Sequence, residues 1–319
     1  MKNFKTPILS IVVPCYNEEE VLPETLKQLD ILYSKLIKYK TIHPESFILF
    51  VDDGSQDNTW ILLQQFSNKY AFIKAIKLSK NEGHQHALLA GMQKVSTQCD
   101  CMISMDADLQ QDPYAVNEMI TIYQKGNEIV LGIRKDRESD SFFKKITAES
   151  YYKIMHFMGV EIEFNHADYR LMSKKALHFF LQFKERNLFI RGMVKLVGLK
   201  TEKVYFKSSE RFAGKSKYPF KKMFSFALAG ITSFSVFPLK LITMSGIFIF
   251  IISIIAGIDA LYTVFFTNEA VPGWASTVLP MYFVGGIQLL SIGILGEYIG
   301  RIYTETKNRP LYFIEDEIK

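Results

Sequence analysis

Short apolar runs alternate with longer mixed stretches along the first part of the chain. The apolar runs have strand length and lie at residues 8–13, 47–51, 72–78, 101–105 and 128–131. Helix-length stretches follow them, and Asn17 is predicted to cap the first helix. Strands that alternate with helices predict an α/β fold, a Rossmann-like and mostly parallel sheet with helices on both faces.

Two longer apolar segments lie near the C-terminal end. Residues 242–266 carry a single charge, Asp259, and residues 277–296 carry none. Each is long enough to cross a hydrocarbon core of about 30 Å as a helix. The pattern predicts two transmembrane helices in a multi-pass protein of the cell (inner or plasma) membrane.

The distribution of charge predicts the orientation of these spans. Residues 267–276, between the spans, contain no Lys or Arg, whereas residues 211–240 contain several and no acidic residue. Since Lys and Arg favour the cytoplasmic side, both ends of the pair are expected there. The N-terminus lacks the apolar region of a signal peptide, so the large N-terminal part is also expected in the cytoplasm. The basic stretch either binds anionic lipid or only sets the topology.

Four parts of the chain are predicted. They are a cytoplasmic domain (1–210), a basic juxtamembrane or interfacial segment (211–240), a two-helix transmembrane domain (241–303) and a cytoplasmic C-terminal tail (304–319). Apolar residues within 186–200 fall mostly on one side of a helix, which predicts an interfacial helix, with ordinary packing as the alternative. Glycines at 285–300 form a small-residue face suited to a homo-oligomer or to packing between the spans.

The strongest candidate chemistry is the pair Asp106 and Asp108. It directly follows the predicted strand 101–105, and open α/β sheets bind ligands at the carboxyl ends of their strands. Two carboxylates at this spacing can share Mg²⁺ or Mn²⁺, which keeps positions open for the phosphates of a nucleotide. A nucleotide-sugar site is the hypothesis, and the alternative is a pair that caps a helix or solvates a turn.

A second carboxylate pair, Asp52 and Asp53, follows the strand 47–51. It either accepts hydrogen bonds from a base or ribose or supports a turn. A dinucleotide cofactor is disfavoured, because the first strand–helix turn lacks Gly-x-Gly-x-x-Gly and carries Glu18 and two further acids that would repel a pyrophosphate. The three cysteines lack a second pair to complete a zinc site.

Seven ordered motifs carry a resemblance to a known family. They lie at residues 13–19, 51–55, 81–91, 105–113, 167–171, 211–218 and 296–301. Together they resemble the family 2 glycosyltransferases, and more closely the polyisoprenyl-phosphate glycosyltransferases. This group is similar to dolichol-phosphate-mannose synthase and bactoprenol glucosyltransferase and has two C-terminal transmembrane helices. The resemblance covers the chain from about Ile8 to Tyr312.

The resemblance implies a GT-A type fold and a role for each motif residue. The implied nucleotide-binding residues are Pro14, Tyr16, Glu18, Asp52, Asp53 and Asp106. The implied ligands of Mg²⁺ or Mn²⁺ are Asp106, Asp108 and Gln110. The implied acceptor-phosphate residues are Arg134, Arg137, Arg170, Arg211 and Lys217. The implied catalytic residues are Asp168 and Asp108.

Asp168 matches the position of the family's proposed base. A lipid phosphate is already an anion near neutral pH and needs little deprotonation. The alternative is that Asp168 orients the acceptor or binds Arg170. The segment His84-Gln85-His86 departs from the Phe-Gly-Lys-like loop of several members, which leaves the sugar open.

The function expected from these observations is inverting, metal-dependent transfer of one sugar, glucose or N-acetylglucosamine, from a UDP-sugar to undecaprenyl or another polyprenyl phosphate. Expected partners are the UDP-sugar, the lipid acceptor, the membrane and a second copy of the chain, with no nucleic acid. The alternatives are a glycosyltransferase that elongates a glycan directly and a non-catalytic membrane scaffold with a nucleotide-binding fold.

Overall fold

The computed structural model describes residues 6–135, 165–186, 188–207, 237–266 and 273–318. The chain divides into two compact units. The first contains the sheet, formed by the described residues up to Lys207 together with those from Arg309 onward. The second contains the two long helices α9 and α10.

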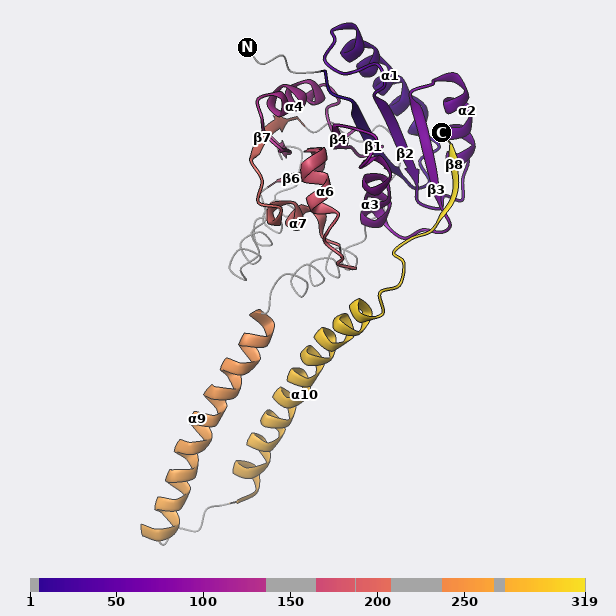
Figure 1. The fold of residues 1–319 in the computed structure, drawn as a ribbon. Coiled ribbons are helices and arrows are strands. Elements are labelled where there is room, and N and C mark those ends of the chain that lie inside the picture. Colours follow the sequence, from indigo (N-terminus) through magenta and orange to yellow (C-terminus); the bar gives the residue numbers. More distant parts are fainter. Residues whose placement is uncertain (1–5, 136–164, 187, 208–236, 267–272, 319) are drawn as a thin grey trace. The chain divides into compact units, whose positions relative to one another are not determined.

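An eight-stranded mixed sheet forms the core of the first unit (Figure 1), in the order β7-β5-β6-β4-β1-β2-β3-β8. The strands are β1 (Leu9–Cys15), β2 (Phe47–Asp52), β3 (Ile73–Leu78), β4 (Cys101–Ser104), β5 (Ile129–Arg134), β6 (His166–Ser173), β7 (Thr201–Phe206) and β8 (Ile314–Ile318). Strands β1 to β4 pair in parallel, as do β5 and β7. Strand β6 runs antiparallel to β4 and β5, and β8 runs antiparallel to β3. The predicted α/β architecture is confirmed, but these two strands make the sheet more mixed than expected.

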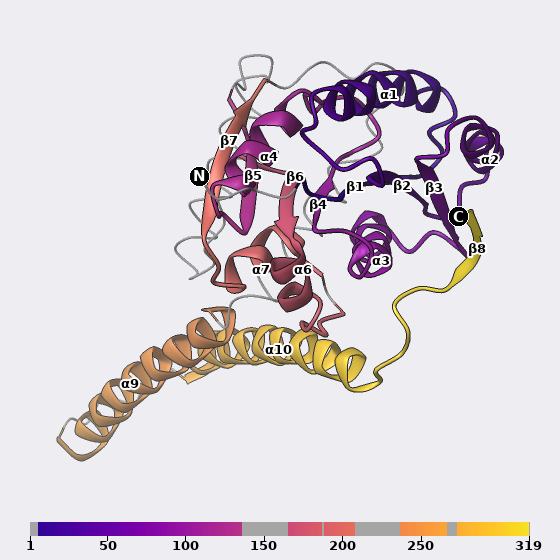
Figure 2. The ribbon, with the colours of Figure 1, turned by 45° about the horizontal axis from the view of Figure 1, so that its top comes forward.

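Helices cover both faces of the sheet, which explains why β1 and β2 are buried along their whole length. Helix α1 (Leu22–Lys38) lies on one face and α3 (His84–Val95) on the other (Figure 2). Helices α2 (Thr59–Lys69) and α4 (Ala115–Gln124) share the core of the α1 face. Gly91 lets α3 approach the sheet closely, because a Cβ atom there would collide with the side chains of Val12 and Val51.

The first helix begins later than the sequence predicts. Asn17 does not cap it: its backbone is left-handed, with φ 52°, and the helix starts at Leu22 with a proline in its first turn. Asparagine tolerates this conformation better than most residues. The polypeptide between β1 and α1 is therefore a loop, which leaves Tyr16 and Glu18 outside regular structure.

The segment 186–200, predicted as an interfacial helix, contains a helix that is shorter than expected. It contains α7 (Ile190–Leu196), a seven-residue helix that follows α6 (Lys174–Phe180), and the chain then enters β7. Met193 and Val194 are buried in the protein, whereas Leu196 is 58% exposed, so the apolar side of this segment packs internally only in part. Its contact with a membrane interface stays a prediction.

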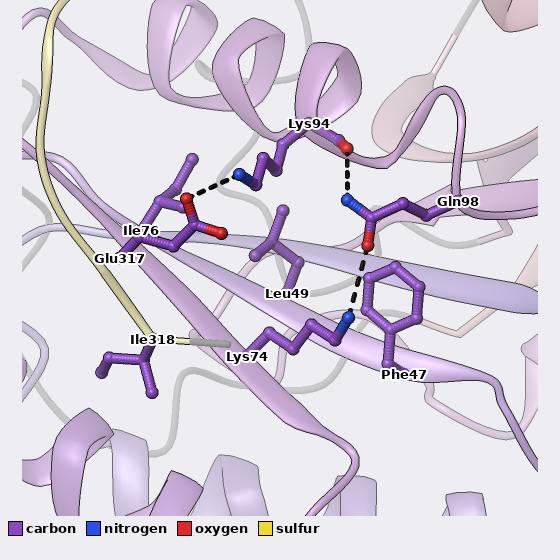
Figure 3. Close-up of a pocket in the computed structure, with 8 residues that line it drawn as sticks. All are labelled: Phe47, Leu49, Lys74, Ile76, Lys94, Gln98, Glu317 and Ile318. Carbon is purple, nitrogen blue, oxygen red and sulfur yellow. Dashed lines mark hydrogen bonds and ion pairs between the residues drawn. The ribbon is translucent and has the colours of Figure 1, made fainter.

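The C-terminal residues, predicted as a tail, provide the edge strand β8. Lys77 pairs with Glu315 at 2.9 Å and Lys94 pairs with Glu317 at 2.6 Å. A cavity of about 220 Å³ lies beside Glu317, where Lys74 donates to Gln98 and Gln98 donates to the Lys94 carbonyl (Figure 3). Strand β8 pairs with β3 and so covers the edge of β3, which would otherwise expose unpaired backbone groups.

The second unit contains α9 (Phe237–Phe266) and α10 (Gly273–Thr306), with Pro280 inside α10. Among the described residues, one segment, Phe283–Thr306, is long and apolar enough to cross a membrane, and Leu239–Ile249 is a shorter apolar stretch. The prediction of two spans is therefore supported for one only, and that span lies further toward the C-terminus than residues 277–296. The predicted multi-pass arrangement is not supported by this finding.

Candidate functional site

The carboxyl ends of β1, β2 and β4 meet at one edge of the sheet. Val12 of β1 is in register with Ser104 of β4, and Cys15 of β1 with Asp52 of β2. Strand β6 runs the opposite way and pairs Arg170 with Ser104, so its first residues reach this same edge. This arrangement brings Asp168, distant in sequence, next to the residues that follow β4.

The loop that carries Asp106 and Asp108 is held by four hydrogen bonds, of which the one from Thr25 is buried and the others are partly buried. Gln111 donates from Nε2 to Asp106 Oδ2 at 2.6 Å, and its Oε1 accepts from the Asp106 backbone N–H at 3.0 Å. Thr25 of α1 donates to the carbonyl of Ala107 at 2.6 Å. The backbone N–H of Gln110 donates to Asp108 Oδ1 at 3.1 Å. Both aspartates are therefore held in place before any ligand binds.

Asp168 is a buried carboxylate between two arginines. Arg170 donates to Oδ1, and Arg191 donates to Oδ2 from Nε at 3.1 Å and from Nη2 at 2.7 Å. Burial acts to raise the pKa of Asp168, but Arg191 and Arg170 outweigh it and hold that pKa well below its usual range. The alternative in which Asp168 binds Arg170 is confirmed, and this environment is unfavourable for a general base.

His84, the first residue of α3, lies between the two carboxylates. Its Nε2 is 3.6 Å from Asp106 Oδ1 and 3.9 Å from Asp168 Oδ2. Burial raises the pKa of Asp106 to about 6, and the nearby His84 opposes that rise. Asp106 is nevertheless partly open to solvent, with 28% of its side chain exposed, so a ligand can reach it.

The predicted nucleotide-binding residues surround this edge, but two of them support loops. Asp52 is fully buried and accepts from the Ser55 backbone N–H at 3.1 Å. Asp53 accepts from the backbone N–H groups of Glu82 and Gly83 at 2.8 and 3.0 Å. Burial raises the pKa of both carboxyl groups. Both aspartates therefore support turns, which was the alternative for this pair. A contact between them and a nucleotide stays a prediction.

The other predicted nucleotide residues lie at the end of β1 and in the loop after it. Pro14 lies within β1, and Tyr16 and Glu18 are half-buried. The backbone N–H of Glu18 donates to Thr59 Oγ1 at 2.9 Å. This bond ties the loop to α2, so the first two strand–helix loops form one connected wall of the site.

The predicted acceptor-phosphate residues lie in different environments. Arg134 ends β5, and its Nε is buried with no hydrogen-bond partner among the described residues. Arg170 is fully buried against Asp168, so no acceptor reaches it in this conformation. Arg137, Arg211 and Lys217 lie outside the described residues.

The donor atoms present suit a cation that arrives with a nucleotide. Within the described residues, no group of three or more His, Cys, Asp or Glu side chains is arranged to hold a metal ion. Asp106, Asp108 and Gln110 offer hard oxygen donors but an incomplete set. Mg²⁺ is often bound by one or two carboxylates together with substrate phosphates, and these residues fit that pattern.

Sequence reasoning missed two residues of the site. Gln111 was passed over for its neighbour Gln110, although it is Gln111 that is buried and bonded to Asp106. Arg191 lies in the segment 186–200, which was considered only for its apolar residues. The one local signal was that His84-Gln85-His86 differs from the loop of several family members. It did not reveal that His84 contacts both carboxylates.

The comparisons with known proteins place the chain among the glycosyltransferases. The chain belongs to glycosyl transferase family 2, whose model matches residues 10–180. The "Uncharacterized glycosyltransferase YkoT" of Bacillus subtilis (strain 168) is 47% identical over 312 residues, covering 98% of this chain and 92% of that protein. The "Bactoprenol glucosyl transferase" of Shigella phage SfV is 37% identical over 311 residues, covering 97% of this chain and 98% of that protein.

Among solved structures, the mannosyltransferase PcManGT from Pyrobaculum calidifontis in complex with GDP-Man and Mn2+ is similar over 96% of this chain and 89% of that chain. The identity is 14% and the TM-score is 0.45.

Proposed function

We propose that this glycosyltransferase moves one sugar, glucose or N-acetylglucosamine, from a UDP-sugar to a polyprenyl phosphate such as undecaprenyl phosphate. The observation that carries the proposal is the meeting of Asp106, Asp168 and His84 at the carboxyl edge of the sheet, with arginines beside them. The phage relative, a bactoprenol glucosyl transferase at 37% identity, supports the choice of acceptor.

The chemistry is an in-line displacement at the anomeric carbon. A phosphate oxygen of the acceptor forms the new bond to that carbon, while the bond to the UDP oxygen breaks and its electron pair leaves with UDP. The configuration at the anomeric carbon is therefore inverted. Because the acceptor oxygen is already anionic near neutral pH, the step needs little help from a base.

Asp168 is then a positioning residue rather than a base. Its two oxygens hold Arg170 and Arg191, and these arginines hold its pKa well below the usual range against the effect of burial. A carboxylate in this setting takes up a proton poorly. Its contribution is to orient cationic groups beside the path of the incoming phosphate.

Asp106, Asp108 and Gln110 would hold Mg²⁺ or Mn²⁺ against the donor diphosphate. When bound, the cation neutralises charge on the departing UDP. The bond from Gln111 fixes Asp106 Oδ2 and leaves Oδ1 on the side of His84. The two aspartates thus present preorganised negative charge, which is what a diphosphate-bound cation requires.

For the nucleoside we propose Pro14, Tyr16 and Glu18, which lie at the end of β1 and in the adjoining loop. Asp53 would act indirectly, since its oxygens hold the backbone of Glu82 and Gly83. Gly83 has φ 91°, a conformation that favours glycine, and it directly precedes His84. Nucleoside binding and the reacting centre are thereby linked through one short loop.

We also propose that the protein is anchored by two transmembrane helices with the sheet in the cytoplasm, and that it forms a homo-oligomer. Phe283–Thr306 supports one span by length and composition. For the other we rely on the near absence of charge in residues 242–266 and on the excess of Lys and Arg outside the two segments.

The decisive experiment supplies membranes that contain the protein with radiolabelled UDP-glucose, UDP-N-acetylglucosamine and other nucleotide sugars. We expect label in the lipid extract that mild acid releases as a single sugar. Label that appears only in polymer would favour direct glycan elongation. No label from any donor, with nucleotide binding intact, would favour the scaffold and contradict the proposal.

A further inference from the structure

Three consecutive residues at the start of α3 reach across the site to different partners. His84 contacts both acidic residues, as described above. Gln85 Oε1 accepts a hydrogen bond from the backbone N–H of Ile190 at 3.2 Å. His86 has Nδ1 2.8 Å from the carbonyl of Glu82 and Nε2 3.3 Å from the carbonyl of Arg186. The first turn of α3 therefore holds the chain that leads into α7.

The residue placed by this contact is Arg191, which directly follows Ile190. Its guanidinium makes two hydrogen bonds to Asp168 Oδ2, at 3.1 and 2.7 Å. The side chain of Arg191 is 37% exposed, whereas Asp168 is 6% exposed and Arg170 is fully buried. Of these three charged groups, Arg191 is the one that an incoming ligand meets.

The charges of this cluster suit an additional anion. Asp168 carries one negative charge and faces two guanidinium groups, one on each oxygen. Arg170 alone can compensate Asp168 from the buried side, which leaves the exposed arginine able to share its fork. In the proposed function the other nearby carboxylate, Asp106, is committed to the metal.

We infer that Arg191 binds the phosphate of the polyprenyl acceptor at the reacting centre, and that Gln85 positions Arg191 for this role. The inference rests on the proposed function and adds a residue to its acceptor site. A guanidinium can give paired hydrogen bonds to a phosphate monoester, a geometry that the ammonium group of lysine does not reproduce. The fork can turn from Asp168 Oδ2 to the phosphate while Arg170 keeps the carboxylate paired.

The test uses the full chain in detergent micelles, with polyprenyl phosphate and whichever UDP-sugar the wild type accepts. Arg191→Lys should raise the KM for the lipid phosphate about tenfold, a loss of about 1.4 kcal/mol. The KM for the UDP-sugar should stay within about twofold of the wild-type value, because in the proposed function other residues contact the donor. Gln85→Leu should shift the lipid KM in the same direction by a smaller factor. Lys195→Gln, which removes a cation from the same helix, is the matched control and should leave both constants unchanged.

Direct binding keeps the test independent of turnover. Calorimetry with a short, water-soluble isoprenyl phosphate should show weaker binding to the Arg191→Lys protein than to the Lys195→Gln protein, with UDP binding equal in both. An unchanged lipid KM, a fall in kcat alone, or an equal rise in both KM values would overturn the inference. The last outcome would assign Arg191 to the donor diphosphate.

The two levels of proposal can fail separately. If the wild type transfers sugar to polyprenyl phosphate but Arg191→Lys keeps its lipid KM and its affinity for isoprenyl phosphate, only the role of Arg191 is wrong. If the wild type uses no polyprenyl phosphate with any donor, the proposed function fails and the inference fails with it.

Discussion

Gln111 should control both the stability of the site loop and the affinity for metal. We consider Gln111→Leu, which keeps the volume roughly constant and removes both polar atoms. The bond from Nε2 to Asp106 Oδ2, at 2.6 Å, involves a charged acceptor when Asp106 is ionised. The bond from the Asp106 backbone N–H to Oε1, at 3.0 Å, is neutral in its donor and acceptor.

A hydrogen bond to a charged group contributes about 1.5–3 kcal/mol and a neutral one about 0.5–1.5 kcal/mol. The side chain of Asp106 is 28% exposed, so water can replace part of the first bond and the lower ends of these ranges apply. We therefore expect Gln111→Leu to destabilise the sheet unit by about 2 kcal/mol. Groups that orient a metal ligand also change metal affinity or activity by about 10- to 100-fold when mutated.

The assay compares Gln111→Leu with Gln110→Leu, its sequence neighbour. The thermal unfolding temperature should fall by several degrees for Gln111→Leu only. The affinity for Mn²⁺, titrated in the presence of UDP, should weaken for both variants. Gln111→Glu should be worse than Gln111→Leu, since it places a second carboxylate against Asp106. If Gln111→Leu unfolds and binds Mn²⁺ like the wild type, the bonds that we assign to Gln111 do not hold Asp106.

Four further outcomes are expected. Asp106→Asn should abolish transfer although the protein still folds, and chelation should reversibly abolish the activity of the wild type; full activity in excess chelator would rule out the metal. Gly91→Ala should destabilise the protein by about 1–3 kcal/mol through overpacking of α3 against the sheet, with kcat per folded molecule retained. The lowered pKa of Asp168 stabilises the fold above the unfolded-state pKa of about 3.9, and that contribution is lost as pH falls toward the lower folded value. The stability gap between wild type and Asp168→Asn, about 3–5 kcal/mol near neutral pH, should therefore narrow in acid, and a gap that stays constant down to pH 3 would contradict the ion pairs. A cysteine at Ala275 should be labelled from outside intact cells and one at Lys307 should not, and the reverse pattern would overturn the proposed orientation.

The sequence predicted the elements whose signal is local. Strands β1 to β5 were expected from short apolar runs, because a strand buried on both faces needs apolar residues at consecutive positions. The Asp-x-Asp pair could be placed at a strand end for the same reason. The start of α1 was misplaced, since Asn17 in a left-handed loop and Asn17 as a helix cap look alike in sequence.

Only the tertiary structure decided how distant segments meet. The antiparallel direction of β6 brings Asp168 to the edge that carries Asp106, and no local pattern specifies strand direction. The strand β8 was hidden in an acidic C-terminal segment because its partners, Lys77 and Lys94, lie far away in the chain.

The periodicity of apolar and polar residues depends on neighbours within one or two helical turns. This sequence by itself therefore determined the strands, the α/β class and the carboxylates that lie at the strand ends. The side-chain contacts of the site depend on sheet order and register, which arise from packing over the whole unit. Arg191 reaches Asp168 from α7, whose first residue, Ile190, is hydrogen-bonded to Gln85. Gln111 rather than Gln110 turns inward to Asp106. Those contacts, and with them the environment that lowers the pKa of Asp168, were decided by tertiary structure alone.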